Sequence, residues 1–147
     1  MQRHPKLIPL SHEHKTLLFL CRYLKKDAAE YEGYPLDTAS KMQHMVRVFQ
    51  ETMVGHIQKE DHLFEQCRGF VPELDEMIDE LAEEHRVISG MYSALVDSPD
   101  LVEGMDQIAR ALEAHIRKEE RLVFGKMQDL LPDVIENLRL PEGEQEQ

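Results

Sequence analysis

Long apolar runs are missing from this chain of 147 residues, in which the longest stretch extends only from Leu17 to Cys21. A membrane-spanning helix needs roughly 20 consecutive apolar residues, so we expect no such helix. The opening segment, MQRHPKLIPL, also lacks the apolar region of a secretion signal. By default, a cytoplasmic location is expected.

Basic residues are scarce, with 17 Lys and Arg against 29 Asp and Glu, which gives a formal net charge of −12. Nucleic acids and anionic membrane surfaces are bound through clustered Lys and Arg, so neither kind of partner is expected. Two cysteines are too few for a disulfide framework. We expect Cys21 and Cys67 to be free thiols, about 27 Å apart along the helices that carry them at ~1.5 Å of rise per residue.

Prolines and glycines cluster at 33–35, 69–72 and 97–99, with a further proline at 132, and they leave long stretches between them. Four helices fit these stretches in one domain spanning residues 1–147, with a core at about 10–130 and a polar tail at 141–147. Gly33 and Gly69 are expected stops, and a short fifth helix is expected after Pro132. The expected starts are Ser11, Asp37 or Thr38, Pro72, and Ser98-Pro99 or Asp100.

Apolar residues recur in each stretch at steps of three and four, which places them on one face of a helix. The four stripes run through Leu10, His14, Leu17, Cys21, Leu24, Ala28 and Tyr31; Met42, Val46, Phe49, Met53, His56, Glu60, Leu63 and Cys67; Leu74, Ile78, Leu81, His85, Ile88, Tyr92 and Leu95; and Leu101, Met105, Ile108, Leu112, His115, Glu119 and Leu122. This pattern predicts an all-α fold, an antiparallel up-down four-helix bundle. The methionines on the stripes are expected to fill the core.

Each stripe is interrupted by polar residues where the pattern calls for an apolar one. They are His14, His56, Glu60, His85, His115 and Glu119. Two ionised carboxylates in a dry core would be costly without compensation, and no Lys or Arg occupies the stripes beside them. A bound pair of cations is the simplest compensation.

The spacing also favours a metal site. His56 and Glu60, like His115 and Glu119, are four residues apart and lie on the same helix face. The two halves of the chain repeat one another: LSHEHKTL matches LAEEHRVI, and HIQKEDHLF matches HIRKEERLVF. We therefore expect one metal near His14 and His56, and another near His85 and His115, bridged by the two glutamates. Imidazole and carboxylate suit iron, with manganese or zinc as substitutes.

Other interpretations exist for single residues. Each histidine alone suits a core residue hydrogen-bonded to a neighbour, and only the joint pattern of six disfavours that interpretation. His12 is the alternative to His14, whereas His4, His44 and His62 are expected to be outside the site. Asp61 and Glu120, one residue beyond the glutamates, suit either a solvated face or acceptors for a ligand imidazole, and we favour the solvated face.

Taken in order, the six residues resemble the motif of the hemerythrin-like family, also called the HHE cation-binding domain. Its helices present His, His-x-x-x-Glu, His and His-x-x-x-Glu, and the opening RHPKLIPLSHEHKTLL is similar to that of bacterial members, which places the first ligand on His14. The resemblance implies a non-haem di-iron centre with bridging carboxylates and an oxo or hydroxo bridge. Such a centre would engage O2, NO or peroxide, or hold iron.

The chain departs from the oxygen-carrying members at one point. Those proteins have a fifth histidine one turn from the third-helix ligand. Here the positions four residues before and after His85 are Leu81 and Ser89. The resemblance then implies an open position at each metal and a role unlike that of a dedicated carrier. It is closer to members that sense iron or oxygen under oxidative or nitrosative stress, or that repair iron–sulfur centres.

Three functions remain in competition. The first is a di-iron protein that binds or senses O2 or NO, or that stores or handles iron. The second is a ferritin-like carboxylate enzyme, but such enzymes use Glu-x-x-His pairs and the chain has none. The third is a metal-free helical adaptor. No nucleophile–base pair and no phosphate-binding glycine loop point to classical catalysis, and the sequence does not indicate the oligomeric state.

Overall fold

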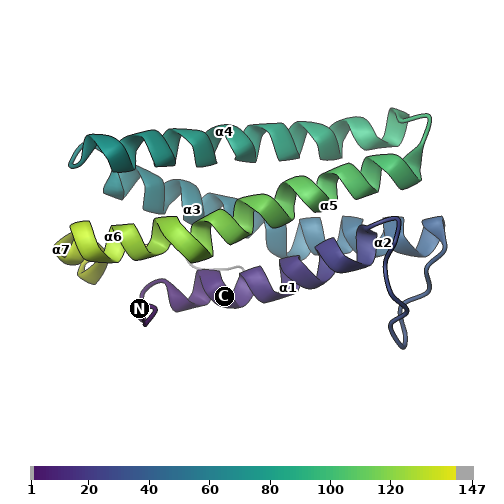
Figure 1. Ribbon diagram of the computed structural model, residues 1–147, viewed down its shortest axis with the longest axis horizontal. Helices are drawn as coiled ribbons and strands as arrows, with labels where there is room; N and C mark the ends of the chain where they lie inside the picture. Colours follow the sequence, from purple (N-terminus) through teal and green to yellow (C-terminus); the bar gives the residue numbers. More distant parts are fainter. Residues whose placement is uncertain (1, 142–147) are drawn as a thin grey trace.

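The computed structural model describes residues 2–141, which form four long helical rods and one short helix (Figure 1). The first rod is α1 (Ile8–Leu24), and the second joins α2 (Thr38–Val48), the π-helical η1 (Phe49–Met53) and α3 (Val54–Cys67). The third is α4 (Pro72–Ala94) with the 3-10 turn η2 (Leu95–Asp97), and the fourth joins α5 (Leu101–Lys118), the π-helical η3 (Glu119–Val123) and α6 (Phe124–Leu130). The short α7 (Pro132–Glu136) follows.

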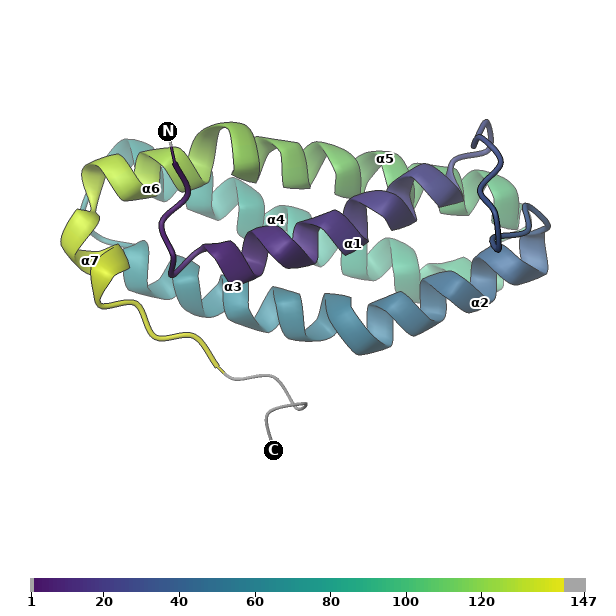
Figure 2. The same cartoon turned by 90° about the horizontal axis from the view of Figure 1, so that it is seen from below.

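The rods pack in chain order around a square, so that the first contacts both the second and the fourth (Figure 2). This confirms the predicted all-α bundle and the short helix after Pro132. Residues 2–141 contain no strand, only an isolated bridge between Tyr31 and Tyr34. Over the same range, no helix combines the length and the apolar character needed to cross a membrane. Residues 142–147 of the expected polar tail lie outside the described residues.

The helix starts agree with the expected caps at three of four places. Asp37 accepts a hydrogen bond from the Ser40 amide at the start of α2, Asp100 accepts one from Glu103 at the start of α5, and Pro72 opens α4. Ser11 is not a cap, because α1 begins three residues earlier at Ile8. The first helix also ends earlier than expected, at Leu24, so Ala28 and Tyr31 lie in the loop that leads to α2.

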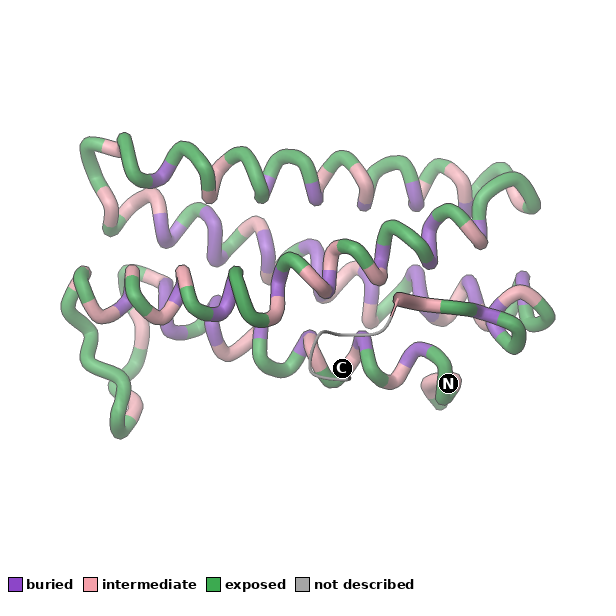
Figure 3. The backbone as a smooth tube through the Cα atoms, turned by 180° about the vertical axis from the view of Figure 1, so that it is seen from behind, coloured by how far each residue is buried: buried purple, intermediate pink, exposed green. Residues whose placement is uncertain are grey.

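The apolar core is divided into two clusters. One surrounds Leu20, Met45 and Leu112, and the other surrounds Leu63 and Ile78. Buried positions recur along the inward faces of all four rods (Figure 3). Cys21 belongs to the first cluster and Cys67 to the second, and both are free thiols as expected.

Two π-helical segments change the phase of the buried stripes. A π turn contains one residue more than an α turn, so every later side chain is rotated by about 100°. In α2, Met45 and Val48 are buried, whereas the predicted Met42 and Val46 are only partly buried. Within η3, the predicted core residue Leu122 is 42 % exposed.

The phase change at η3 is explained by a difference in length between the two repeated segments. HIRKEERLVF is one residue longer than HIQKEDHLF, and η3 accommodates the extra residue within its wider turn. Phe124 is thereby returned to the buried face occupied by Phe64 in the other half. Leu63 and Leu122, each three residues after a buried glutamate, consequently have opposite environments.

This difference predicts opposite outcomes for the same substitution. Leu63→Ala should lower the free energy of unfolding by about 2–5 kcal/mol, because Leu63 is fully buried. Leu122→Ala should change it by only about 0.5 kcal/mol, as at other surface positions. Urea unfolding of both variants at one fixed metal content measures the difference, and equal losses would show that the phase change is wrong.

Candidate metal centre

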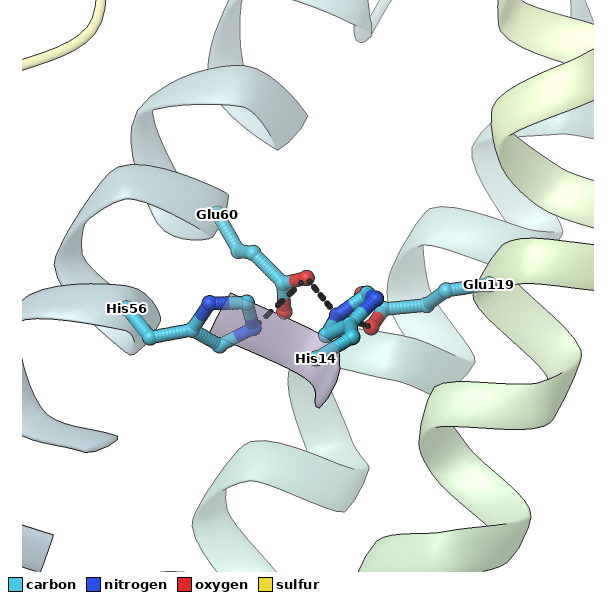
Figure 4. Close-up of side chains that lie close together, drawn as sticks. All are labelled: His14, His56, Glu60 and Glu119. Carbon is cyan, nitrogen blue, oxygen red and sulfur yellow. Dashed lines mark hydrogen bonds and ion pairs between the residues drawn. The ribbon is translucent and has the colours of Figure 1, made fainter. Parts of the chain in front are cut away.

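The six polar residues of the predicted site come together in one buried layer between the two apolar clusters. His14 comes from α1, His56 and Glu60 from α3, His85 from α4, His115 from α5, and Glu119 is the first residue of η3. All six side chains are buried, and the two glutamates are inaccessible to solvent. Figure 4 shows four of them pointing toward one another.

Their potential ligand atoms form two groups, each of which lies within 4.8 Å. One group contains His14 and His56, the other contains His85 and His115, and both contain the two glutamates. The predicted division into two histidine pairs that share two carboxylates therefore agrees with the structure.

Glu60 lies between the two pairs and turns one oxygen toward each. Its Oε2 atom is 3.2 Å from Nε2 of His14 and 3.1 Å from Nε2 of His56. Its Oε1 atom is 2.8 Å from Nε2 of His85 and 3.6 Å from Nε2 of His115. Glu119 approaches both pairs through Oε1, at 3.1 Å from His14 and 3.4 Å from His115. This placement suits carboxylates that bridge two ions.

The outward ring nitrogen of each histidine contacts a further carboxylate. The four Nδ1 contacts are Glu13 with His56 at 2.9 Å, Asp61 with His85 at 3.1 Å, Glu84 with His115 at 2.7 Å, and Glu120 with His14 at 2.6 Å. Each carboxylate lies on the rod before that of its histidine, and the fourth rod supplies the first, so the contacts close a ring around the bundle. We call these four residues the carboxylate ring.

The carboxylate ring fixes the tautomer of the histidines. An ionised carboxylate can only accept a hydrogen bond, so Nδ1 must carry the proton in each pair. In a neutral imidazole, Nε2 then keeps its lone pair and directs it into the layer. Histidine ligands of metal ions are commonly oriented by an outer carboxylate in this way.

Several buried atoms in the layer lack a hydrogen-bond partner. They are Nε2 of His56, Nε2 of His115 and both carboxylate oxygens of Glu119. Glu119 lies 3.1 Å from His14, and Glu60 lies 3.1 Å from Nε2 of His56, but neither contact has the direction of a hydrogen bond to these atoms. Buried polar atoms without partners are rare and costly, and here all four are of the kinds that ligate metal ions. The residues present therefore fit a metal centre.

Without an ion, protons would compensate the carboxylates. Burial alone would lower the pKa of His14, but its contacts with three carboxylates outweigh burial and raise the pKa to about 11. The same opposition raises the pKa of His56 to about 9 and that of His115 to about 12. Burial favours a higher pKa for Glu60, but the surrounding imidazoles hold it well below the usual value.

The remaining histidines are outside the layer. His12 and His62 are exposed, which leaves His14 as the residue of α1 in the site. His4 pairs with Glu136 on the surface at 2.9 Å. His44 is also outside the layer, as expected, and its side chain is partly buried because it packs edge-on against Tyr23 and Tyr34.

Sequence reasoning missed half of the carboxylate ring. Asp61 and Glu120 are acceptors for the imidazoles, the alternative that the sequence favours less than a solvated face, whereas Glu13 and Glu84 are absent from the predicted site. A signal existed, because each half of the repeat has glutamate directly before its first histidine, in SHEH and in AEEH. Lys59 and Lys118, which precede the two buried glutamates, pair with Glu13 and Glu84 in turn.

Comparison with known protein families agrees with this arrangement. The model of the hemerythrin HHE cation-binding domain matches residues 9–131, and the chain belongs to this family. Comparisons with curated proteins and with solved structures gave no significant match.

The carboxylate ring predicts a loss of metal affinity when one member is neutralised. Glu84→Gln should weaken metal binding by about 10–100-fold, because an amide orients His115 less well than a carboxylate. Glu80→Gln is the matched control, since Glu80 also contacts Lys118 but lies on the surface and contacts no histidine. Competition with a chelator of known affinity measures both variants, and equal affinities would contradict the role of Glu84.

The raised histidine pKa values predict that metal binding releases protons. At pH 7, the imidazoles of His14, His56 and His115 in the metal-free protein each carry a second proton, on Nε2. This proton must leave before Nε2 can bind an ion. The apparent affinity should therefore rise as the pH rises from 6 towards 9. Titration calorimetry in buffers of different ionisation enthalpy measures the released protons, and a heat that is independent of the buffer would contradict the prediction.

Proposed function

We propose that this hemerythrin-type HHE domain holds two iron ions in the buried layer. His14 and His56 would bind one ion, His85 and His115 would bind the other, and Glu60 and Glu119 would bridge them. Imidazole and carboxylate are ligands that suit iron, with zinc and manganese as substitutes. The carboxylate ring would keep the four imidazoles in the tautomer that presents Nε2 to the ions.

One observation carries this proposal: four buried nitrogen and oxygen atoms of the layer have no hydrogen-bond partner. A metal-free adaptor would leave these atoms unpaired in a dry core, at a cost that a helical scaffold has no reason to bear. Bound cations would satisfy them and would neutralise both glutamates. This favours a metal-binding function over a purely structural one.

We further propose that the centre binds O2 or NO, as part of sensing these gases or of handling iron under oxidative or nitrosative stress. A di-iron pair would supply a redox-active centre with room for a small diatomic ligand. The positions one helical turn before and after His85 on α4 are Leu81, which is buried, and Ser89, which is exposed. Neither position supplies a fifth histidine to the layer. The available ligands would therefore leave a position open.

The chain's own residues would keep water out of the layer. Phe124 stacks on the His14 ring at 5.7 Å, and Phe64 stacks on the His85 ring at 5.5 Å. Apolar clusters close the layer on both sides along the bundle axis. Such a dry site would strengthen the electrostatic hold of the glutamates on the ions.

Metal analysis tests this function directly. The purified chain should carry close to two irons per molecule and show near-ultraviolet ligand-to-metal absorption, because each ion has its own pair of histidines. His56→Ala and Glu119→Ala should abolish that absorption, whereas His62→Ala should retain it, since His62 is exposed.

The same protein tests the diatomic ligand. Addition of NO to the reduced, iron-loaded chain should shift its absorption, and an unchanged spectrum would contradict gas binding while leaving the metal centre intact. A chain that took up no iron, and whose unfolding was unaffected by chelation, would contradict the metal centre itself.

A further inference from the structure

The N-terminal segment of residues 2–7, here called the N-terminal arm, lies against the fourth rod beside α6 (Figure 2). Gln128 holds it at three points: its side-chain oxygen accepts from the His4 amide at 2.9 Å and from Nη1 of Arg3 at 3.3 Å, and its Nε2 donates to the Gln2 carbonyl at 2.9 Å. The arm is therefore attached to the segment that directly follows the metal-site residues of η3.

Arg3 reaches from the arm to Glu120, a member of the carboxylate ring. Its Nη2 atom donates to the Glu120 backbone carbonyl at 2.7 Å and to Oε1 at 3.3 Å. The other oxygen of Glu120, Oε2, accepts from the Ser11 hydroxyl at 2.7 Å and is 2.6 Å from Nδ1 of His14. Arg3 thus holds the carboxylate that orients His14.

Arg3 also contacts the second group that packs on His14. Its guanidinium lies 5.3 Å from the centre of the Phe124 ring, a distance typical of a cation–π contact. Phe124 in turn stacks on the His14 imidazole, with an angle of 14° between the rings. One side chain therefore fixes both the hydrogen bond and the stacking that determine how His14 is placed.

The other half of the repeat has no counterpart of this arrangement. His85 contacts Asp61 at 3.1 Å and stacks on Phe64, but the Asp61 side chain is 56 % exposed and pairs with no Lys or Arg within residues 2–141. Ala82 occupies the position that Ser11 has in the first half. The Glu120 side chain is only 28 % exposed and is paired with Arg3. Its carboxylate is therefore more tightly constrained than the equivalent carboxylate of Asp61.

We propose that Arg3 is a positioning residue for His14, and that it couples the N-terminal arm to the metal position formed by His14 and His56. The inference rests on the proposed metal centre, which it deepens. Arg3 acts through Glu120 and Phe124 and does not itself contact an ion. The two metal positions consequently differ in strength, and only one of them depends on the arm.

Coupling of this kind is reciprocal, because a contact that strengthens metal binding must itself be strengthened by the metal. An ion bound at His14 holds the imidazole still, which holds Glu120 and Phe124 in the geometry that Arg3 recognises. Removal of the metal should therefore loosen the arm without unfolding the bundle.

Arg3→Ala tests the coupling in the full chain, with anaerobic Fe(II) as the probe. Loss of an outer partner costs about 10–100-fold in metal affinity, and Arg3 acts one step further out, so one of the two binding steps should weaken by about 3–10-fold. The other step should stay unchanged. Lys6→Ala is the control, because Lys6 attaches the same arm to the Leu138 carbonyl at 3.3 Å but contacts no part of the carboxylate ring.

A double-mutant cycle with Glu120→Gln identifies the route. If Arg3 acts through Glu120, Arg3→Ala should have little further effect on Fe(II) affinity in the Glu120→Gln chain. Hydrogen exchange supplies a readout that requires no variant: an N-terminal peptide of the wild-type chain should exchange more slowly with Fe(II) bound than without it.

The possible results separate the inference from the function on which it rests. If the wild-type chain binds two Fe(II) ions, but Arg3→Ala matches Lys6→Ala or weakens both steps equally, the coupling is wrong and the metal centre stands. Arm exchange that is identical with and without Fe(II) would also overturn the coupling. A wild-type chain that binds no Fe(II) would overturn the metal centre, and the coupling with it.

Discussion

The burial of two carboxylates in the middle of a helical bundle is the constraint on which the rest of this structure depends. Glu60 and Glu119 are fully inaccessible to solvent, and no lysine or arginine within the described part of the chain pairs with them. Ionised carboxylates in such a place require positive charge close by. Every rod responds by directing an imidazole into the same layer, and the apolar core is divided into two clusters to make room for it.

The compensation can come from protons or from cations, and the geometry distinguishes between them. Protonated histidines account for the pKa values raised to about 11 and 12 at His14 and His115. They do not, however, provide well-directed partners for both oxygens of Glu119. Ions shared by the two glutamates would give both oxygens of Glu119 a partner. This explains why the family's cation-binding motif places its glutamates at buried positions in this chain.

Much of this could be predicted from the sequence, because burial patterns and the His-x-x-x-Glu spacing depend on local helix geometry. The bundle and the gathering of His14 and Glu60 in one layer follow from it. The exposure of Leu122 could not be predicted from a continuous α-helical period, since η3 inserts a residue into the turn. Contacts between rods were harder still: Glu13 and Glu84 act on histidines of a neighbouring helix, and their role depends on rotations that no single stripe encodes.

The carboxylate ring has a consequence for how the bundle can move. Each rod gives one acceptor to the next rod and takes one from the previous rod, and the sequence of contacts returns to its starting point. A rod cannot turn about its own axis without breaking both its incoming and its outgoing contact. The alignment of the four helices is thus locked around the layer, and the weakest link is the 3.1 Å contact of buried His85 with Asp61, the most exposed of the four carboxylates.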